Sequence, residues 1–143
     1  MQTKMTIDHE PIGQPRPRAV RRGYSIGMYT PTTHAVTSFK RMIVMAWKQV
    51  NGRSQYSGPI AVWIHAWFSR PKRMVYKRKQ MHEHWHVTKP DADNIAKAVL
   101  DALNGVAWKD DAQVCAVHVV KRVRSDASPG RVDITIEELS NEQ

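Results

Sequence analysis

The 143-residue sequence has a single cysteine, no long hydrophobic run and few acidic residues in its first 90 positions. The lone Cys115 excludes an internal disulfide and any zinc site built on several cysteines, and it suits a reducing compartment. Because Cys115 lies in an apolar run, we expect it to fill space in the core. No uncharged apolar run approaches the roughly 20 residues of a membrane span, and the N-terminal MQTKMTIDHE lacks the apolar segment of a signal peptide. We therefore expect one cytoplasmic domain spanning residues 1–143.

Charge is divided unevenly along the chain, whose formal net charge is +9. Residues 1–90 hold sixteen Lys and Arg against three acidic residues, whereas residues 91–143 hold six against ten. A basic surface beside a small acidic focus suits a polyanion whose phosphates bind Lys and Arg. The alternative is that the surplus positive charge only keeps the protein in solution.

Two basic segments supply most of the candidate phosphate contacts. Residues 11–23 combine three Pro, two Gly and four Arg, which favours an extended arm. Residues 69–88 mix basic residues and His with aromatic rings, which can stack on exposed bases. The alternative for either segment is a solvated loop. The candidate DNA-binding residues are Arg16, Arg18, Arg21, Arg22, Lys72, Arg73, Lys77, Arg78, Lys79 and Lys89.

Hydrophobic periodicity predicts a small single-domain α/β (α+β) fold, in which two main helices pack on a mixed sheet. Apolar residues recur at three- and four-residue steps over about residues 33–49, which predicts a helix covering one face of the sheet. Both alternating sets over residues 58–68 are apolar, which predicts a central strand covered on both sides. We expect short strands near residues 5–10 and 24–31, and a hairpin over residues 112–137.

A second helix is predicted over residues 91–104. Pro90 disfavours helical geometry at the residue before it, and Asp91 suits the N-cap. An apolar stripe follows until Asn104, where the helix is expected to end. Asp93 lies in the first turn, and Lys97 lies one turn further on, within reach of its carboxylate.

Acidic residues crowd around this helix: the stretch from residue 89 to 114 holds five of the thirteen in the chain. Asp110 and Asp111 fall where the next strand is expected to begin, and at most one of them can point toward the helix start. Carboxylates within a few Å of one another stay ionised together only if a cation lies among them. This crowding predicts a Mg²⁺ site, with Mn²⁺ as an alternative ion, on a DNA-binding surface.

Two other interpretations of the candidate ligands are open. Asp91 could be only a helix cap, and Asp93 and Lys97 only a surface ion pair worth a few tenths of a kcal/mol. His82, His84 and His86 alternate as along one face of a strand, and such a row can bind transition metals.

The run KPDADNIAKAVLDALNGVAWKDDAQV, residues 89–114, resembles the signature of RusA-type Holliday-junction resolvases. The resemblance implies a homodimeric Mg²⁺-dependent endonuclease that resolves four-way DNA junctions by paired symmetric nicks in recombination and repair. Such proteins are common in bacteria and their prophages, so the implied location is the cytoplasm of a bacterium or a phage-infected host. It further implies that Asp91, Asp93 and Asp111 are catalytic and bind the metal, and that Lys97 is catalytic. The same match selects Asp111 over Asp110.

Two further functions fit the same residues. A non-catalytic basic DNA-binding protein would bind with steep salt dependence and without Mg²⁺. A metal-dependent nuclease acting on unbranched DNA or RNA is also compatible, because carboxylate chemistry does not specify the shape of the substrate. If the protein is a two-fold dimer, it presents one site to each of two opposing strands of a junction. The candidate interface aromatics are Trp63, Trp67, Trp85 and Trp108.

Overall fold

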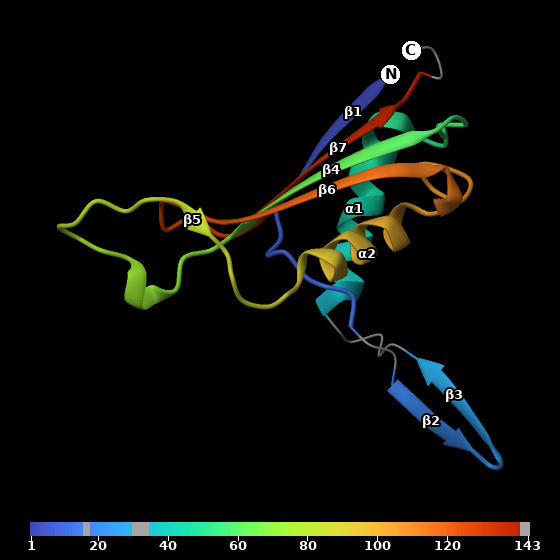
Figure 1. Ribbon diagram of the computed structural model, residues 1–143, viewed down its shortest axis with the longest axis horizontal. Coiled ribbons are helices and arrows are strands. Elements are labelled where there is room, and N and C mark those ends of the chain that lie inside the picture. The colour runs from blue at the N-terminus through green and yellow to red at the C-terminus, as the bar shows by residue number, and fades with distance from the viewer. Residues whose placement is uncertain (16–17, 30–34, 141–143) are drawn as a thin grey trace.

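The computed structural model describes residues 1–15, 18–29 and 35–140 and has a mixed α/β fold, as expected. A five-stranded sheet in the order β1-β7-β4-β6-β5 carries two helices, and a two-stranded hairpin stands apart from it (Figure 1). The strands of the sheet are β1 (Gln2–Ile7), β4 (Ile60–Phe68), β5 (His84–Trp85), β6 (Val114–Val123) and β7 (Arg131–Glu138). The other elements are the hairpin strands β2 (Arg18–Arg22) and β3 (Ser25–Tyr29), helices α1 (Ala35–Asn51) and α2 (Ala92–Leu103), and the 3₁₀ turns η1 (Lys72–Met74) and η2 (Asp111–Gln113). Within the described residues, neither helix combines the length and apolarity that a membrane crossing needs.

The hydrophobic core lies between the two helices and one face of the sheet. The apolar stripes predicted on both helices are confirmed, since their members are buried together. One of the two alternating sets of apolar side chains predicted on β4 is buried together with them. The buried side chains include Val36, Phe39, Ile43 and Trp47 of α1, Ile95, Ala98, Val99, Ala102 and Leu103 of α2, and Ile60, Val62, Ile64, Ala66 and Phe68 of β4.

Strand β4 is central, between β7 and β6, but only one of its faces is covered. On the other face Trp63 is 37% exposed, and His65 and Trp67 are half-buried. The ring of Trp63 stacks on that of His118 from β6, with centroids 5.9 Å apart. The expectation of cover on both sides is therefore wrong for a single chain, because both helices pack against the same face.

The expected hairpin over residues 112–137 is also wrong. β6 pairs with β4 in parallel and β7 pairs with β4 antiparallel, so β4 separates them. Adjacent strands lie roughly 4.8 Å apart, so the connection at residues 124–130 has to cross only about 10 Å. Cys115 does not fill the core as expected but is exposed, at the register shift where β6 begins.

The predicted basic arm over residues 11–23 divides into two parts. Pro11 to Pro15 runs extended against the protein body, whereas Arg18–Arg22 is paired as β2 with β3. Arg16 lies outside the described residues, and Arg18 and Arg22 are described by their backbone alone. The arm is therefore part extended chain and part hairpin strand.

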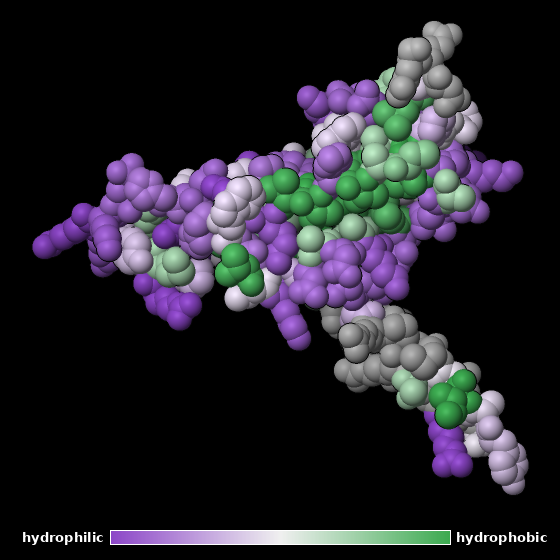
Figure 2. All heavy atoms as spheres, viewed as in Figure 1, coloured by the Kyte–Doolittle hydropathy of each residue, from purple (hydrophilic) through white to green (hydrophobic). Residues whose placement is uncertain are grey.

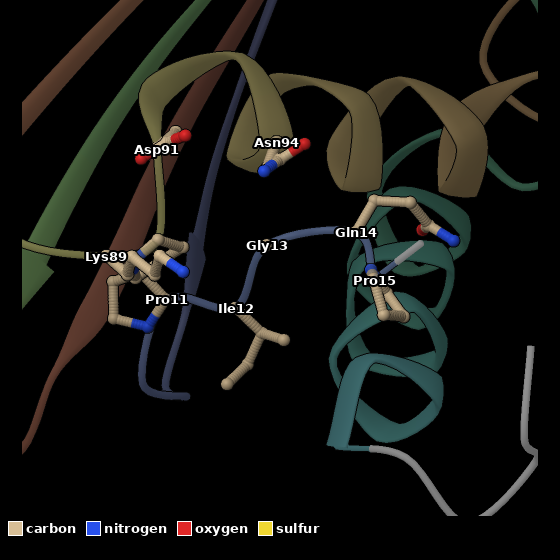
Figure 3. Close-up of a pocket in the computed structure, with 9 residues that line it drawn as sticks. Pro11, Ile12, Gly13, Gln14, Pro15, Lys89, Asp91 and Asn94 are labelled. Carbon is tan, nitrogen blue, oxygen red and sulfur yellow. The ribbon is translucent and has the colours of Figure 1, made fainter. Parts of the chain in front are cut away.

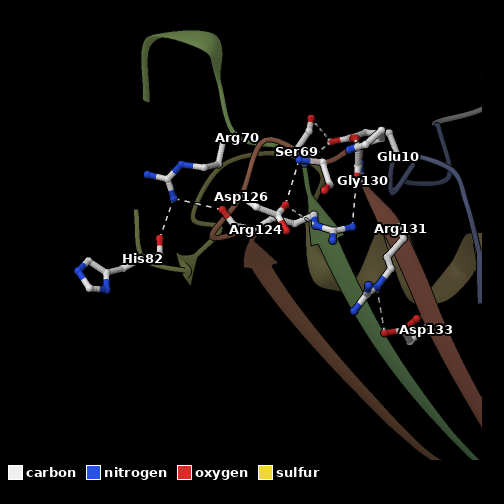
Figure 4. Close-up of polar contacts among 11 residues, drawn as sticks. Glu10, Ser69, Arg70, His82, Arg124, Asp126, Gly130, Arg131 and Asp133 are labelled. Atoms are coloured by element: carbon white, nitrogen blue, oxygen red, sulfur yellow. Dashed lines mark hydrogen bonds and ion pairs between the residues drawn. The ribbon is translucent and has the colours of Figure 1, made fainter. Parts of the chain in front are cut away.

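Glu10 joins three segments that are far apart in the sequence (Figure 4). One carboxylate oxygen accepts hydrogen bonds from Ser69 N and Ser69 Oγ, both at 3.0 Å, and the other accepts from Gly130 N at 3.0 Å. A Cβ on Gly130 would collide with this carboxylate. The end of β1, the end of β4 and the start of β7 are thereby fixed at the root of the 69–88 loop.

We expect Glu10→Gln to lower the free energy of unfolding by about 1–3 kcal/mol, because an amide nitrogen replaces one acceptor and leaves backbone or hydroxyl donors unpaired. Urea unfolding at neutral pH measures the change. Glu137→Gln is the matched control, since the Glu137 side chain bonds no described residue. Equal stabilities of the two variants would show that Glu10 does not hold these segments.

Candidate active site

The first turn of α2 holds Asp91 and Asp93. Asp91 occupies the N-cap in extended geometry, and its backbone oxygen accepts from Ile95 N at 3.1 Å, but its side chain makes no capping hydrogen bond. Both aspartates are exposed. Among the described residues, neither carboxylate has an ion pair or a hydrogen bond, and Asp93 forms no pair with Lys97. The two carboxylates therefore form neither a helix cap nor an ion pair with a described residue, and they are available to a ligand.

A pocket of about 690 Å³ opens beside Asp91 (Figure 3). Its wall is the extended segment from Pro11 to Pro15, which is held against α2 by a hydrogen bond from Gln14 N to Asn94 O at 2.9 Å. Lys89 and Asp91 lie at one end of this pocket, and Gln14 lies at the other. An ammonium group and a carboxylate thus border the same open space, which suits a phosphate that arrives with a cation.

Gly13 allows the wall of the pocket to lie close to the helix. A Cβ at this position would be 2.8 Å from Pro90 Cβ and 3.1 Å from Asn94 Cβ. Both neighbours are anchored close to the backbone and can move little. The wall therefore requires glycine for steric reasons at the point where it meets the start of α2.

Asp110 stabilises the turn that leads into β6. Its side chain accepts from Ala112 N at 3.0 Å, and the side chain of Gln113 accepts in return from Asp110 N at 3.1 Å. This capping box holds η2, so the strand begins only at Val114. The expectation that the two aspartates lie at the start of the strand is therefore wrong. The carboxylate of Asp110 is thus engaged in the fold.

Asp111 lies at the far end of α2 from Asp91. Its Oδ1 accepts from Trp108 Nε1 at 2.8 Å, and its backbone N–H donates to Asn104 Oδ1 at 3.1 Å, where Asn104 is the C-cap of α2. A helix of 12 residues is roughly 18 Å long. Within one chain the structure brings Asp91 and Asp93 into one turn and keeps Asp111 away from them. Over the described residues no group of three or more His, Cys, Asp or Glu is placed to hold a metal ion.

The three histidines of the 69–88 loop do not converge. His84 pairs with Val123 in the sheet, and the ring of His86 stacks on Phe68 with centroids 3.6 Å apart. Burial against this ring, with a smaller effect from the Lys121 ammonium, lowers the pKa of His86. The pKa of the more distant His65 is also lowered, chiefly by burial. His84 and His86 thus contribute to the fold of the loop, and the arrangement of the three loop histidines gives no support to a transition-metal site.

Arg70 is a residue whose role the sequence does not reveal. It is 9% exposed and donates to three backbone oxygens, Met74 O at 3.0 Å, His82 O at 2.7 Å and Arg124 O at 3.1 Å. Figure 4 shows the contacts with His82 and Arg124, through which Arg70 links the loop to the connection after β6. In the sequence Arg70 looks like the exposed basic residues that follow it. Only its burial in the folded protein distinguishes it from them.

Apart from Lys89, which borders the pocket, the remaining basic candidates lie on two elements on either side of the α2 start (Figure 1). The 69–88 loop extends from one end of the sheet, and the β2–β3 hairpin extends in another direction. The candidates with described side chains are all exposed: Arg21, Lys72, Arg73, Lys77, Arg78, Lys79 and Lys89.

Comparison with known proteins adds two findings. The family model described as "Endodeoxyribonuclease RusA" matches residues 8–137 of the chain. The chain is also 30% identical over 142 residues to the "Uncharacterized protein YqaN" of Bacillus subtilis (strain 168), an alignment that covers 96% of each protein. The matched region includes the start of α2, Asp111 and both basic elements.

We expect Gly13→Ala to lower the free energy of unfolding by about 1–3 kcal/mol, because the added methyl group forces the pocket wall away from Pro90. Urea unfolding measures the loss. Gly58→Ala is the comparison variant, because its Cβ would meet Glu138 Cγ at 3.3 Å, a milder contact than the 2.8 Å approach at Gly13. A loss as large in Gly58→Ala would contradict the close approach at Gly13.

Proposed function

This chain belongs to the RusA endodeoxyribonuclease family, and from that membership we propose a Mg²⁺-dependent enzyme that resolves four-way DNA junctions by paired symmetric nicks. The family makes the chain a Holliday junction resolvase, which hydrolyses DNA phosphodiester bonds in recombination. The observation that carries the finer proposal is the pair of carboxylates in the first turn of α2, which no described residue engages. The bacterial or phage-infected cytoplasm, where such DNA is met, is the proposed location.

The donor set supports a divalent metal. Asp91 and Asp93 offer exposed carboxylate oxygens, which are the ligands that Mg²⁺ prefers and that Mn²⁺ also accepts. Asp111 would add a third carboxylate, of which only one oxygen is bound by Trp108. When bound, Mg²⁺ would supply Lewis-acid polarisation of the scissile phosphate.

The proposed residue roles follow from the chemistry of hydrolysis, in which a water oxygen bonds to phosphorus as one P–O ester bond breaks. Negative charge builds up on the phosphoryl oxygens during this step, and a nearby cation stabilises it. Lys97 is exposed, pairs with no described carboxylate and lies one turn after Asp93. Lys89 borders the pocket beside Asp91, where it would hold the incoming phosphate.

Asp111 would join this site only from a second copy of the chain. Because α2 separates Asp111 from Asp91 by roughly 18 Å, a single subunit cannot place both on one ion. In a two-fold dimer whose α2 helices run antiparallel, the partner's Asp111 would approach Asp91. The same symmetry gives one site to each of the two opposing strands that must be cut.

The two basic elements are proposed to hold the arms of the junction. Their exposed Lys and Arg side chains extend on either side of the α2 start, so phosphates from two directions can be bound while one reaches Asp91. Such binding should weaken steeply as salt concentration rises.

We expect Asp91→Asn to lower junction cleavage by at least roughly 100-fold, because the variant loses a charged metal ligand. Junction binding should be unchanged or stronger, since repulsion between the carboxylate and phosphate is reduced. Single-turnover cleavage and gel-shift titration on one preparation measure the two properties. Asp101→Asn on the same helix is the control, since its carboxylate lies 3.9 Å from Lys40 and outside the proposed site. Weakened binding with normal cleavage of the bound junction would contradict the assignment.

Substrate shape and metal dependence are tested together with labelled four-way junction, linear duplex and single-stranded RNA, each with Mg²⁺ and with EDTA. We expect paired symmetric nicks in the junction with Mg²⁺, and no cleavage in EDTA. Cleavage of all three substrates would leave a metal-dependent nuclease but exclude a junction resolvase. Binding without cleavage in either condition would exclude both.

A further inference from the structure

Trp85 is an exposed tryptophan in β5, at the edge of the sheet where the 69–88 loop returns to it (Figure 1). The residue is 63% exposed, so it is the tryptophan of this chain that leaves most of its ring to solvent. The other four tryptophans are more covered: Trp47, Trp63, Trp67 and Trp108. Neither the hydrophobic core nor the carboxylates of the first α2 turn use the Trp85 ring.

Arg122 holds the ring of Trp85 in a fixed orientation. The two residues are paired across β5 and β6, and Arg122 Cζ lies 4.1 Å from the centroid of the ring. Arg122 Nη2 in turn donates to Glu83 Oε1 at 3.0 Å. Among the described residues no other ring or cation stacks on Trp85. The guanidinium therefore covers one face of the indole and leaves the other face open.

The backbone that follows Trp85 is fixed to β6. His86 N donates to Lys121 O at 3.0 Å, and Lys121 Nζ donates to Thr88 O at 2.8 Å. Asp91 follows Trp85 by six residues, and six residues of extended chain span at most about 20 Å. This length corresponds to roughly six base steps of 3.4 Å along one DNA strand. Trp85 is thus held on a fixed segment, within a few nucleotides of a phosphate bound at Asp91.

The surroundings of Trp85 suit a polyanion. The 69–88 loop carries six Lys and Arg, and its one acidic residue, Glu83, is paired with Arg122. Hydrophilic residues dominate this loop in Figure 2. A second ring, that of Tyr76, is 37% exposed and lies 5.2 Å from Lys79 Nζ. Aromatic rings among cations are the combination with which proteins stack on bases and neutralise phosphates at the same time. A protein partner would instead favour a patch depleted of lysine.

We propose that the open face of Trp85 stacks on a nucleobase that is exposed at the branch point of the DNA. Inside a linear duplex the neighbouring base pairs cover both faces of each base, so an indole finds no face to stack on. Where strands exchange at a four-way junction this stacking is interrupted, and a base face becomes available. Trp85 would therefore favour branched DNA, whereas Lys and Arg bind the phosphates of either form. The inference deepens the proposed function, on which it rests for the DNA substrate.

The test compares Trp85→Ala with the parent by fluorescence anisotropy in EDTA, where binding is measured without metal. The affinity for four-way junction should fall by roughly 5- to 100-fold, and the affinity for linear duplex should change little. The slope of log Kd against log salt concentration should stay the same, because no phosphate contact is lost. Trp85→Phe keeps a ring and should lose less affinity. Val50→Ala shortens a 66% exposed apolar side chain on α1 and should bind as the parent does.

A photochemical measurement detects the contact itself. Irradiated 5-iodouracil should crosslink to Trp85 when it stands at the branch point of the junction, but not when it stands in the interior of an arm. Mass spectrometry of the digested complex locates the crosslinked residue. Trp85→Ala should lose this crosslink, and circular dichroism confirms that each variant is folded.

Equal losses of junction and duplex affinity, a changed salt slope, or no crosslink at Trp85 would overturn the stacking. Sedimentation velocity without DNA adds one outcome, because a changed subunit association in Trp85→Ala would assign the ring to a protein interface and contradict the proposal. A parent that forms the crosslink yet cuts no junction with Mg²⁺ would overturn the proposed function and leave the stacking in place. A parent that cuts junctions without forming the crosslink would do the reverse.

Discussion

The candidate site depends on how α2 is fixed by its own apolar stripe. Five residues of that stripe are buried against the sheet and α1, so the orientation of the helix is set by core packing rather than by its polar residues. Fixing the helix in this way leaves its first turn facing the solvent. Asp91 and Asp93 can then stay unpaired at the surface, where the energetic cost of leaving carboxylates without partners is small.

The same packing sets the distance that separates the two ends of the acidic motif. Asp91 and Asp111 are 20 positions apart in the sequence, but the residues between them form a helix and a tight turn, held by Trp108 and Asn104. Shortening α2 would bring the carboxylates closer and would also remove buried apolar residues from the core. Under the proposed function, a second subunit would avoid this conflict, because it would supply the third carboxylate without altering the helix.

The sequence predicted those features that have a local physical cause. The stripes of α1 and α2 follow from the 3.6-residue repeat, and the central place of β4 follows from its apolar length. The predicted hairpin over residues 112–137 was wrong because the alternation of apolar residues in two strands does not show whether the strands are neighbours. Here β4 lies between β6 and β7. The predicted start of β6 was wrong because the capping box at Asp110 holds the next residues in a turn instead of strand geometry. The buried role of Arg70 and the steric need for Gly13 depend on tertiary contacts, which no local pattern encodes.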